Sequence, residues 1–270
     1  MQQNGEILRA RVGHRLCAAV LFVDDFTGRP IEGRALSVSA AELPTAPVSK
    51  PDGWYLFLNY GGDALTVTAS GRYYEKKTVK LDCTALDPLN PVLRVRLTPN
   101  RCYPLPPHAT CLESRAQPDR EVRLWCAGDP NVMRLSADYA PDGEADGRLL
   151  RLYDPCGADP AGRCFALLRR GSQKEEYFSV RQCVDREEDG CLLEAPLRSP
   201  CKKMGARIFP VYGTRTDAQG RFFLLLPSAA AGTVLSCRVQ VQQSDGSWKS
   251  FEAEPEAGKY TFLELKEPKK

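Results

Sequence analysis

The chain has 270 residues, of which 43% are hydrophobic and 26% are charged, and its net charge is +3. This composition is typical of a globular protein and excludes a disordered or fibrous chain. The small net charge gives no strong field that would favour DNA, RNA or anionic lipid, and the longest apolar run, residues 17–23, is far too short for a membrane span of roughly 20 residues.

Strand signals dominate the first hundred residues. Residues 18–23 form a short apolar run that is typical of a buried strand, and a turn with Asp, Gly and Pro follows at 24–30. Alternating or aromatic segments predict further strands at 35–40, 54–58, 65–69, 78–81 and 92–97. Because no helical stretch separates these segments, residues 1–98 are expected to form an antiparallel β-sandwich.

Residues 99–120 carry five prolines and little periodicity, so we expect a Pro-rich, extended linker there. Residues 121–270 are again rich in strand signals and predict a second β domain, with a subdivision near residue 200 left open. The predicted strands are 121–126, 132–137, 148–153, 164–168, 177–180, 206–211, 221–226, 234–242, 248–251 and 260–265. Short helices fit only near 40–43 and 229–232, so the fold class is all-β.

Three motifs of the first domain recur in a known family. They are Asp24-Asp25-Phe26-Thr27-Gly28-Arg29-Pro30, Asp52-Gly53-Trp54-Tyr55 and Gly71-Arg72-Tyr73-Tyr74. With these motifs, residues 18–97 resemble the carboxypeptidase regulatory-like, transthyretin-like β-sandwich domain. Residues 220–225 line up with residues 53–58, so a partial echo of the same sandwich is expected at 206–243. The resemblance implies a non-catalytic module for folding, spacing or docking, and it carries over no active-site residues.

The eleven cysteines form no Cys-x-x-Cys pair, and their number is odd. We expect reduced, structural thiols, with Cys17, Cys126 and Cys237 as small buried hydrophobic residues. Two alternatives stay open: some disulfides, or a metal site at Cys156, Cys164, Cys183 and Cys191. The sequence shows no secretory signal peptide, so the expected localisation is cytoplasmic as synthesised, with membership of a released particle as a further option.

No catalytic constellation is recognisable, so the chain is predicted not to be an enzyme and to need no cofactor. The two histidines, His14 and His108, begin no His-x-x-Glu pattern, and Cys111, three residues after His108, is only a weak candidate for a cysteine nucleophile. The acidic groups Asp24/Asp25 and Glu187/Glu188/Asp189 fit turns and solvated loops better than a glycosidase pair. A calcium site is conceivable at one acidic loop, with candidate ligands Asp138, Asp142, Glu144 and Asp146.

These observations predict a non-catalytic structural or adaptor protein that docks other protein subunits through sheet edges and loops. A phage-tail-like or contractile injection particle is one setting for such a subunit. The alternative is a carbohydrate-binding sandwich of a surface or exported protein, and a third option is an enzyme with an unrecognised site in 121–200. The candidate ligand or partner contacts are Trp54, Tyr73, Tyr74 and Trp248; nucleic acid and a membrane span are not expected.

Overall fold

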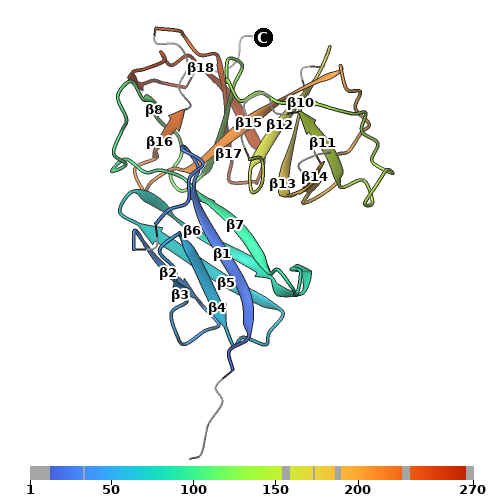
Figure 1. Ribbon diagram of the computed structural model, residues 1–270. Helices are drawn as coiled ribbons and strands as arrows, with labels where there is room; N and C mark the ends of the chain where they lie inside the picture. The colour runs from blue at the N-terminus through green and yellow to red at the C-terminus, as the bar shows by residue number, and fades with distance from the viewer. Residues whose placement is uncertain are drawn as a thin grey trace, which may run out of the picture.

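The computed structural model describes residues 13–32, 34–153, 159–172, 174–185, 190–226 and 232–265, and over these residues the fold is all-β. Figure 1 shows three bodies: a sandwich that contains the N-terminal strands, and two lobes side by side beyond one of its ends. A single short 3-10 helix, Cys83–Ala85, interrupts the described strands. The candidate helix near 40–43 is absent, because Ala40 ends a strand and residues 41–42 form a turn, and residues 229–231 of the other candidate helix lie outside the described residues.

The first sandwich is made of two sheets. One has the strand order β3-β4-β1-β7 and the other has the order β2-β5-β6. The strands are β1 (Leu16–Asp24), β2 (Leu36–Ala40), β3 (Val48–Ser49), β4 (Trp54–Leu58), β5 (Ala64–Gly71), β6 (Tyr74–Asp82) and β7 (Val92–Leu97). The sandwich differs from the predicted antiparallel one at an edge, because β7 runs parallel to β1 after the chain has crossed to the other sheet and back.

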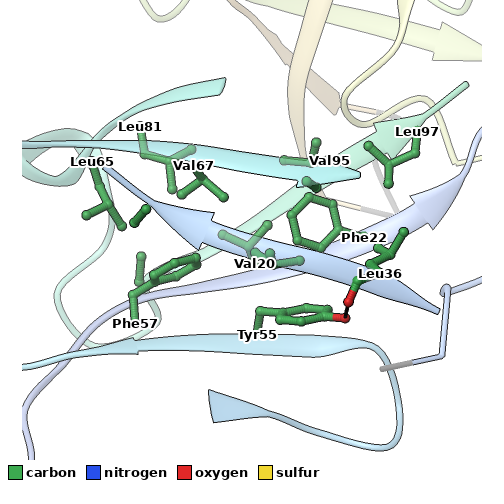
Figure 2. Close-up of a cluster of buried hydrophobic side chains, with 14 of the residues drawn as sticks. Val20, Phe22, Leu36, Tyr55, Phe57, Leu65, Val67, Leu81, Val95 and Leu97 are labelled. Atoms are coloured by element: carbon green, nitrogen blue, oxygen red, sulfur yellow. Dashed lines mark hydrogen bonds between the residues drawn. The ribbon is translucent and has the colours of Figure 1, made fainter. Parts of the chain in front are cut away.

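Alternating side chains of the two sheets meet in one core (Figure 2). Phe22, Phe57 and Leu65 are almost completely buried there, as expected for inward-facing positions of strands with a period of two. The Tyr55 hydroxyl reaches the Leu36 carbonyl oxygen at 3.3 Å, so its polar end is paired inside the core. The burial of this core accounts for the apolar alternation seen in the sequence.

The second sandwich uses strands from both ends of the remaining chain. Its strands are β8 (Thr110–Arg115), β9 (Glu121–Cys126), β16 (Arg221–Leu226), β17 (Cys237–Gln242), β18 (Trp248–Ala253) and β19 (Tyr260–Phe262). One sheet has the order β16-β8-β19, and in the other β9 is followed by β17 and β18. The segment 99–120 is therefore not a linker throughout: residues 110–115 form β8, the central strand of a sheet, and this stretch contains none of the five prolines of the segment.

The two sandwiches share one topology. β8 pairs antiparallel with β16 and parallel with β19, as β1 does with β4 and β7. β9, β17 and β18 pair in order as β2, β5 and β6 do. The turns before β4 and β16 match as well, with Gly53 at φ 88° and Gly220 at φ 74°. The repeat of the first sandwich is thus wider than the expected residues 206–243. The strand that corresponds to β2 is β9, which lies before residue 206 in the chain.

A barrel is inserted between β9 and β16. It is built from β10 (Arg134–Leu135), β11 (Leu149–Tyr153), β12 (Cys164–Arg169), β13 (Glu175–Asp185), β14 (Gly190–Leu193) and β15 (Ala206–Arg215). The strand order is β10-β11-β14-β13-β12-β15, and backbone hydrogen bonds between Met133 and Ile208 close the ring. β15 continues past the barrel and pairs with β9, which joins the barrel to the second sandwich.

Polar contacts connect the first sandwich with the inserted segment. The Arg163 Nη2 donates to the Asp25 carbonyl oxygen at 2.6 Å, and the Arg96 Nε donates to the Ala161 carbonyl oxygen at 3.0 Å. The Thr214 hydroxyl of β15 donates to the Glu75 carboxylate at 2.5 Å. These contacts involve β6, β7 and the turn after β1, so one end and one edge of the first sandwich are covered. The domain boundaries at residues 98 and 120 stay predictions.

Candidate functional site

The candidate contact Trp54 and its neighbour Tyr55 lie on β4 and face opposite sides of the sheet. Tyr55 is 2% exposed and belongs to the core, whereas Trp54 is half-buried on the outer face. This division follows from the alternation of side chains along a strand, which points neighbouring residues to opposite faces.

Tyr74 is held inside a hydrogen-bond network. Its hydroxyl donates to Asp24 Oδ2 at 2.9 Å, and the Tyr103 hydroxyl donates to the same oxygen at 2.6 Å. Burial, followed by the charge of Asp24, raises the pKa of Tyr74 far above its usual value. Tyr74 therefore anchors the β5–β6 hairpin to the turn after β1, while Tyr73 is half-buried, with the Arg72 guanidinium 5.5 Å from its ring centroid.

Trp248 stacks on an arginine. The Arg123 guanidinium carbon lies 3.9 Å from the Trp248 ring and 3.4 Å from the Tyr177 ring, and Arg123 Nε donates to Gln240 Oε1 at 2.7 Å. Burial lowers the pKa of Arg123, and the contact with two rings stabilises its charge. The four candidate aromatic residues thus lie at separate places, on β4, in the β5–β6 hairpin and on β18, and they do not form one platform.

The cysteines depart from the prediction at one pair. Cys126 and Cys237 lie directly opposite each other on β9 and β17 and form a disulfide, so they are not reduced thiols. Cys183 and Cys191 face each other on β13 and β14 with their sulfur atoms 4.0 Å apart. The third metal candidate, Cys164, lies on β12 opposite Ser179, and Cys156 lies outside the described residues. Within the described ranges, no three His, Cys, Asp or Glu side chains gather as metal ligands would.

The acidic loop and the residues considered for catalysis are engaged in other contacts. Asp138 pairs with Lys202 at 2.8 Å and Glu144 pairs with Arg151 at 3.3 Å, while Asp142 and Asp146 are exposed. His14 lies 3.0 Å from the Asn59 amide nitrogen, and His108 is exposed. Burial raises the pKa of the Cys111 thiol to about 11, which keeps it protonated near neutral pH and argues against a nucleophile. Asp24 caps its turn as predicted, by accepting the backbone N–H groups of Phe26 and Thr27, whereas 187–189 lie outside the described residues.

A groove of about 480 Å³ lies at the open side of the second sandwich, between β18 and β19. Its apolar lining comes from both sheets: Val241, Phe251, Phe262, Leu263 and Leu265. Two cations lie over its aromatic rings, with Arg115 5.8 Å from the Phe262 centroid and Lys249 Nζ 5.3 Å from the Phe251 centroid. One acidic side chain, Glu264, also lines the groove, so its lining keeps a positive balance, which suits an apolar segment that carries acidic groups.

Along this groove runs the edge strand β19, on which Tyr260 is 54% and Phe262 is 52% exposed. Its hydrogen-bonded neighbour is β8, and its other edge meets no further strand among the described residues. The corresponding edge of the first sandwich is β7, which is covered: Arg94 and Asp159 form an ion pair beside it, and Arg96 donates to Ala161. Two edges of the same topology therefore differ, because the described residues of the protein cover only one of them.

Sequence reasoning placed a strand at 260–265 but did not find this groove. The groove depends on β18 and β19 lying at the same side of two facing sheets, and neither pairing can be read from local patterning. The spacing of Tyr260 and Phe262, two aromatic residues on one face of a terminal strand, is the signal that could have pointed to it.

Known proteins give little guidance to these features. No protein-family model matches the sequence, and no curated protein matches it. Two solved structures resemble it weakly, both of BcpA, the major pilin subunit of Bacillus cereus. The D312A variant is 8% identical to this chain, with a TM-score of 0.26, and the match covers 94% of this chain and 70% of the pilin. BcpA itself is 6% identical, with a TM-score of 0.24, and the match covers 94% of this chain and 69% of the pilin. Similarity at this level carries no argument about function.

Among the residues that the structure describes, no helix is long and apolar enough to span a membrane.

Proposed function

We propose that the protein is a non-catalytic structural or adaptor subunit, and that it docks another protein chain along the β19 edge. The occupant is an extended segment of a partner subunit, with apolar side chains for the groove and acidic groups for Arg115 and Lys249. Such a segment would extend the sheet by hydrogen bonding to β19, while its alternate side chains enter the groove. The observation that carries the proposal is the contrast between the covered edge β7 and the exposed edge β19.

The exposed aromatic side chains support docking over mere surface variation. Edge strands of stable proteins are commonly blocked by charged side chains, and β6 follows that rule with Lys76, Lys77 and Lys80. β19 instead presents Tyr260 and Phe262. An edge that is both apolar and open is suited to accept a strand.

Site-specific photo-crosslinking tests the proposal. A photoreactive phenylalanine analogue at position 262, in protein expressed in its native source, is expected to crosslink to an extended apolar and acidic segment of a different chain. The same analogue at Leu89, which is 95% exposed in the loop before β7, is the matched control and is expected to give no such product. Crosslinks from position 262 to a second copy, or to residues of the same chain, would contradict the proposal.

The setting of this subunit is part of the same proposal. Synthesis in the cytoplasm followed by incorporation into a released particle, such as a phage-tail-like one, remains the prediction from sequence. The Cys126–Cys237 disulfide supports a working place outside the reducing cytosol, because structural disulfides persist in oxidising surroundings.

The alternative is a carbohydrate-binding sandwich. Because Trp54, Tyr73, Tyr74 and Trp248 lie apart, each would have to act without the others, and Tyr74 and Trp248 already contact Asp24 and Arg123. Glycan-array binding that is lost in Trp248→Ala or Tyr73→Ala, together with no crosslink from position 262, would favour this alternative.

A further inference from the structure

Cys183 and Cys191 form a pair that nothing in the docking proposal uses. β13 and β14 are antiparallel neighbours, and the two cysteines lie directly opposite each other in the register. Their sulfur atoms are 4.0 Å apart, whereas a disulfide needs about 2.05 Å. Facing residues on neighbouring antiparallel strands have Cβ atoms close to the separation that a disulfide requires, so rotation of the side chains and a small strand movement can close this distance.

The protein itself contains a precedent for this geometry. Cys126 and Cys237 occupy directly opposite positions on the antiparallel strands β9 and β17, and they are bonded. Cys183 and Cys191 therefore repeat, on the barrel, the arrangement that produces a disulfide in the second sandwich.

The two thiols differ in their access to solvent. Cys183 is exposed, whereas Cys191 is 3% exposed and belongs to the core of the barrel. A reagent from solution would consequently react first at Cys183, and Cys191 lies within reach to attack the product. This division between an accessible and a resolving cysteine is typical of redox-active pairs.

We propose that Cys183 and Cys191 are a reversible redox site that forms a disulfide by exchange with a low-molecular-weight disulfide such as oxidised glutathione. The Cys183 thiol loses its proton to solvent, and the thiolate attacks one sulfur of the glutathione disulfide. One glutathione leaves as a thiolate, and a mixed disulfide remains. The Cys191 thiolate, after losing its own proton, attacks the Cys183 sulfur and expels the second glutathione. The two cysteines lose two electrons, and one glutathione disulfide becomes two glutathione thiols.

The bond would form next to the contact between the barrel and the first sandwich. The Cys183 thiol donates a hydrogen bond to Asp159 Oδ1, with the sulfur 3.6 Å from that oxygen. The Asp159 carboxylate also pairs with Arg94, and its carbonyl oxygen accepts Arg96 Nη2 at 2.6 Å. Oxidation removes the thiol hydrogen from this group, so the redox state of the pair acts on residues that hold the edge β7.

Peptide mapping of the full-length protein tests the site. After treatment with oxidised glutathione and alkylation, tryptic digestion separates residues 182–186 from residues 187–198, so the bond appears as these two peptides joined. We expect this joined species to form and to disappear after addition of a reductant. Cys164 and Cys201 are the internal controls, because burial raises the pKa of both thiols. They are expected to remain reduced during the treatment and to be recovered as alkylated cysteines.

The variant Cys191→Ala distinguishes the two steps. It is expected to hold Cys183 as the mixed disulfide with glutathione, whereas the wild-type protein passes through that state. The proposal is overturned if the wild-type protein accumulates the mixed disulfide, if Cys183 bonds to another cysteine, or if neither residue reacts while the fold is intact by circular dichroism.

Discussion

At the scale of single residues, Asp24 shows how one carboxylate organises distant parts of the chain. Its Oδ1 accepts the N–H groups of Phe26 and Thr27, while its Oδ2 accepts the hydroxyls of Tyr74 and Tyr103. The local contacts were predictable from the Asp-x-x-Thr-Gly pattern. The two tyrosines lie 50 and 79 residues away, and no local pattern could have indicated them.

Replacement of Asp24 should therefore cost more than the loss of a turn. Asp24→Ala leaves two half-buried hydroxyls and two N–H groups without their acceptor, and we expect a loss of about 2–4 kcal/mol in the free energy of unfolding. Tyr103→Phe removes only one of these hydrogen bonds and should cost about 1 kcal/mol. Urea denaturation of both variants checks the difference, and equal losses would show that Asp24 acts through the turn alone.

Glu75 gives the contact between the first sandwich and β15 a dependence on pH. Burial raises its pKa from 4.5 to about 7, although the hydrogen bond from Thr214 acts in the opposite direction. The folded protein therefore holds a proton that the unfolded chain has already released, so this group stabilises the fold at low pH. Its contribution falls as the pH rises from 4.5 to about 7, by at most about 1.4 kcal/mol per pH unit.

The variant Glu75→Gln should remove this slope, since an amide can still accept the Thr214 hydroxyl but does not titrate. Free energies of unfolding measured in urea at several values between about pH 5 and pH 8 give the comparison. Glu121 is an exposed residue that lines the same pocket as Glu75, and Glu121→Gln is therefore the control, which should keep the wild-type slope. An unchanged slope in Glu75→Gln would contradict the assignment.

At the scale of elements, the strands agree well with the sequence and their pairings do not follow from it. β4, β7, β9 and β16 lie where their residue patterns predicted them. β3 and β14 escaped notice because they are short, and β8 because prolines precede it. Parallel pairing of β1 with β7 and of β8 with β19 depends on chain crossings that local alternation does not encode.

The turn before β16 permits a test of the repeated topology. A Cβ atom at Gly220 would lie 2.1 Å from the Ala116 carbonyl oxygen, and φ there is positive. Gly246, in the β17–β18 turn, has a similar φ but open space around it. Gly246→Ala should cost about 1–2 kcal/mol from the backbone alone, and Gly220→Ala clearly more, because a backbone carbonyl must also move. Thermal denaturation measures both, and equal costs would argue against the close approach.

At the scale of the whole molecule, two sandwiches of one topology are held together by an inserted barrel. The sequence indicated the first sandwich and part of the second, but the insertion separates β9 from β16 by the whole barrel and hides the repeat. The groove at β19 could not be predicted for the same reason: it is formed by strands whose positions depend on the complete second sandwich.

Arg163 connects the barrel with the first sandwich, and its removal should loosen the molecule without unfolding it. Arg163→Ala loses the hydrogen bond to the Asp25 carbonyl oxygen and the ion pair with the Asp25 carboxylate at 3.4 Å. We expect a larger radius of gyration in small-angle X-ray scattering with unchanged circular dichroism. Arg215→Ala, which breaks an exposed pair with Asp119, is the control. No change in the radius of Arg163→Ala would mean that other contacts suffice.

Hydrogen exchange along β19 tests the docking account most directly. The exchange rates of the amides of residues 260–263 are compared between the free protein and the protein in its native assembly. The amides of β2 and β6, the two edge strands of one sheet of the first sandwich, are the internal references. If a partner strand adds to this edge, exchange at residues 260–263 slows in the assembly while the reference edges keep their rates. Slowed exchange at β2 or β6 with no change along β19 would contradict the account.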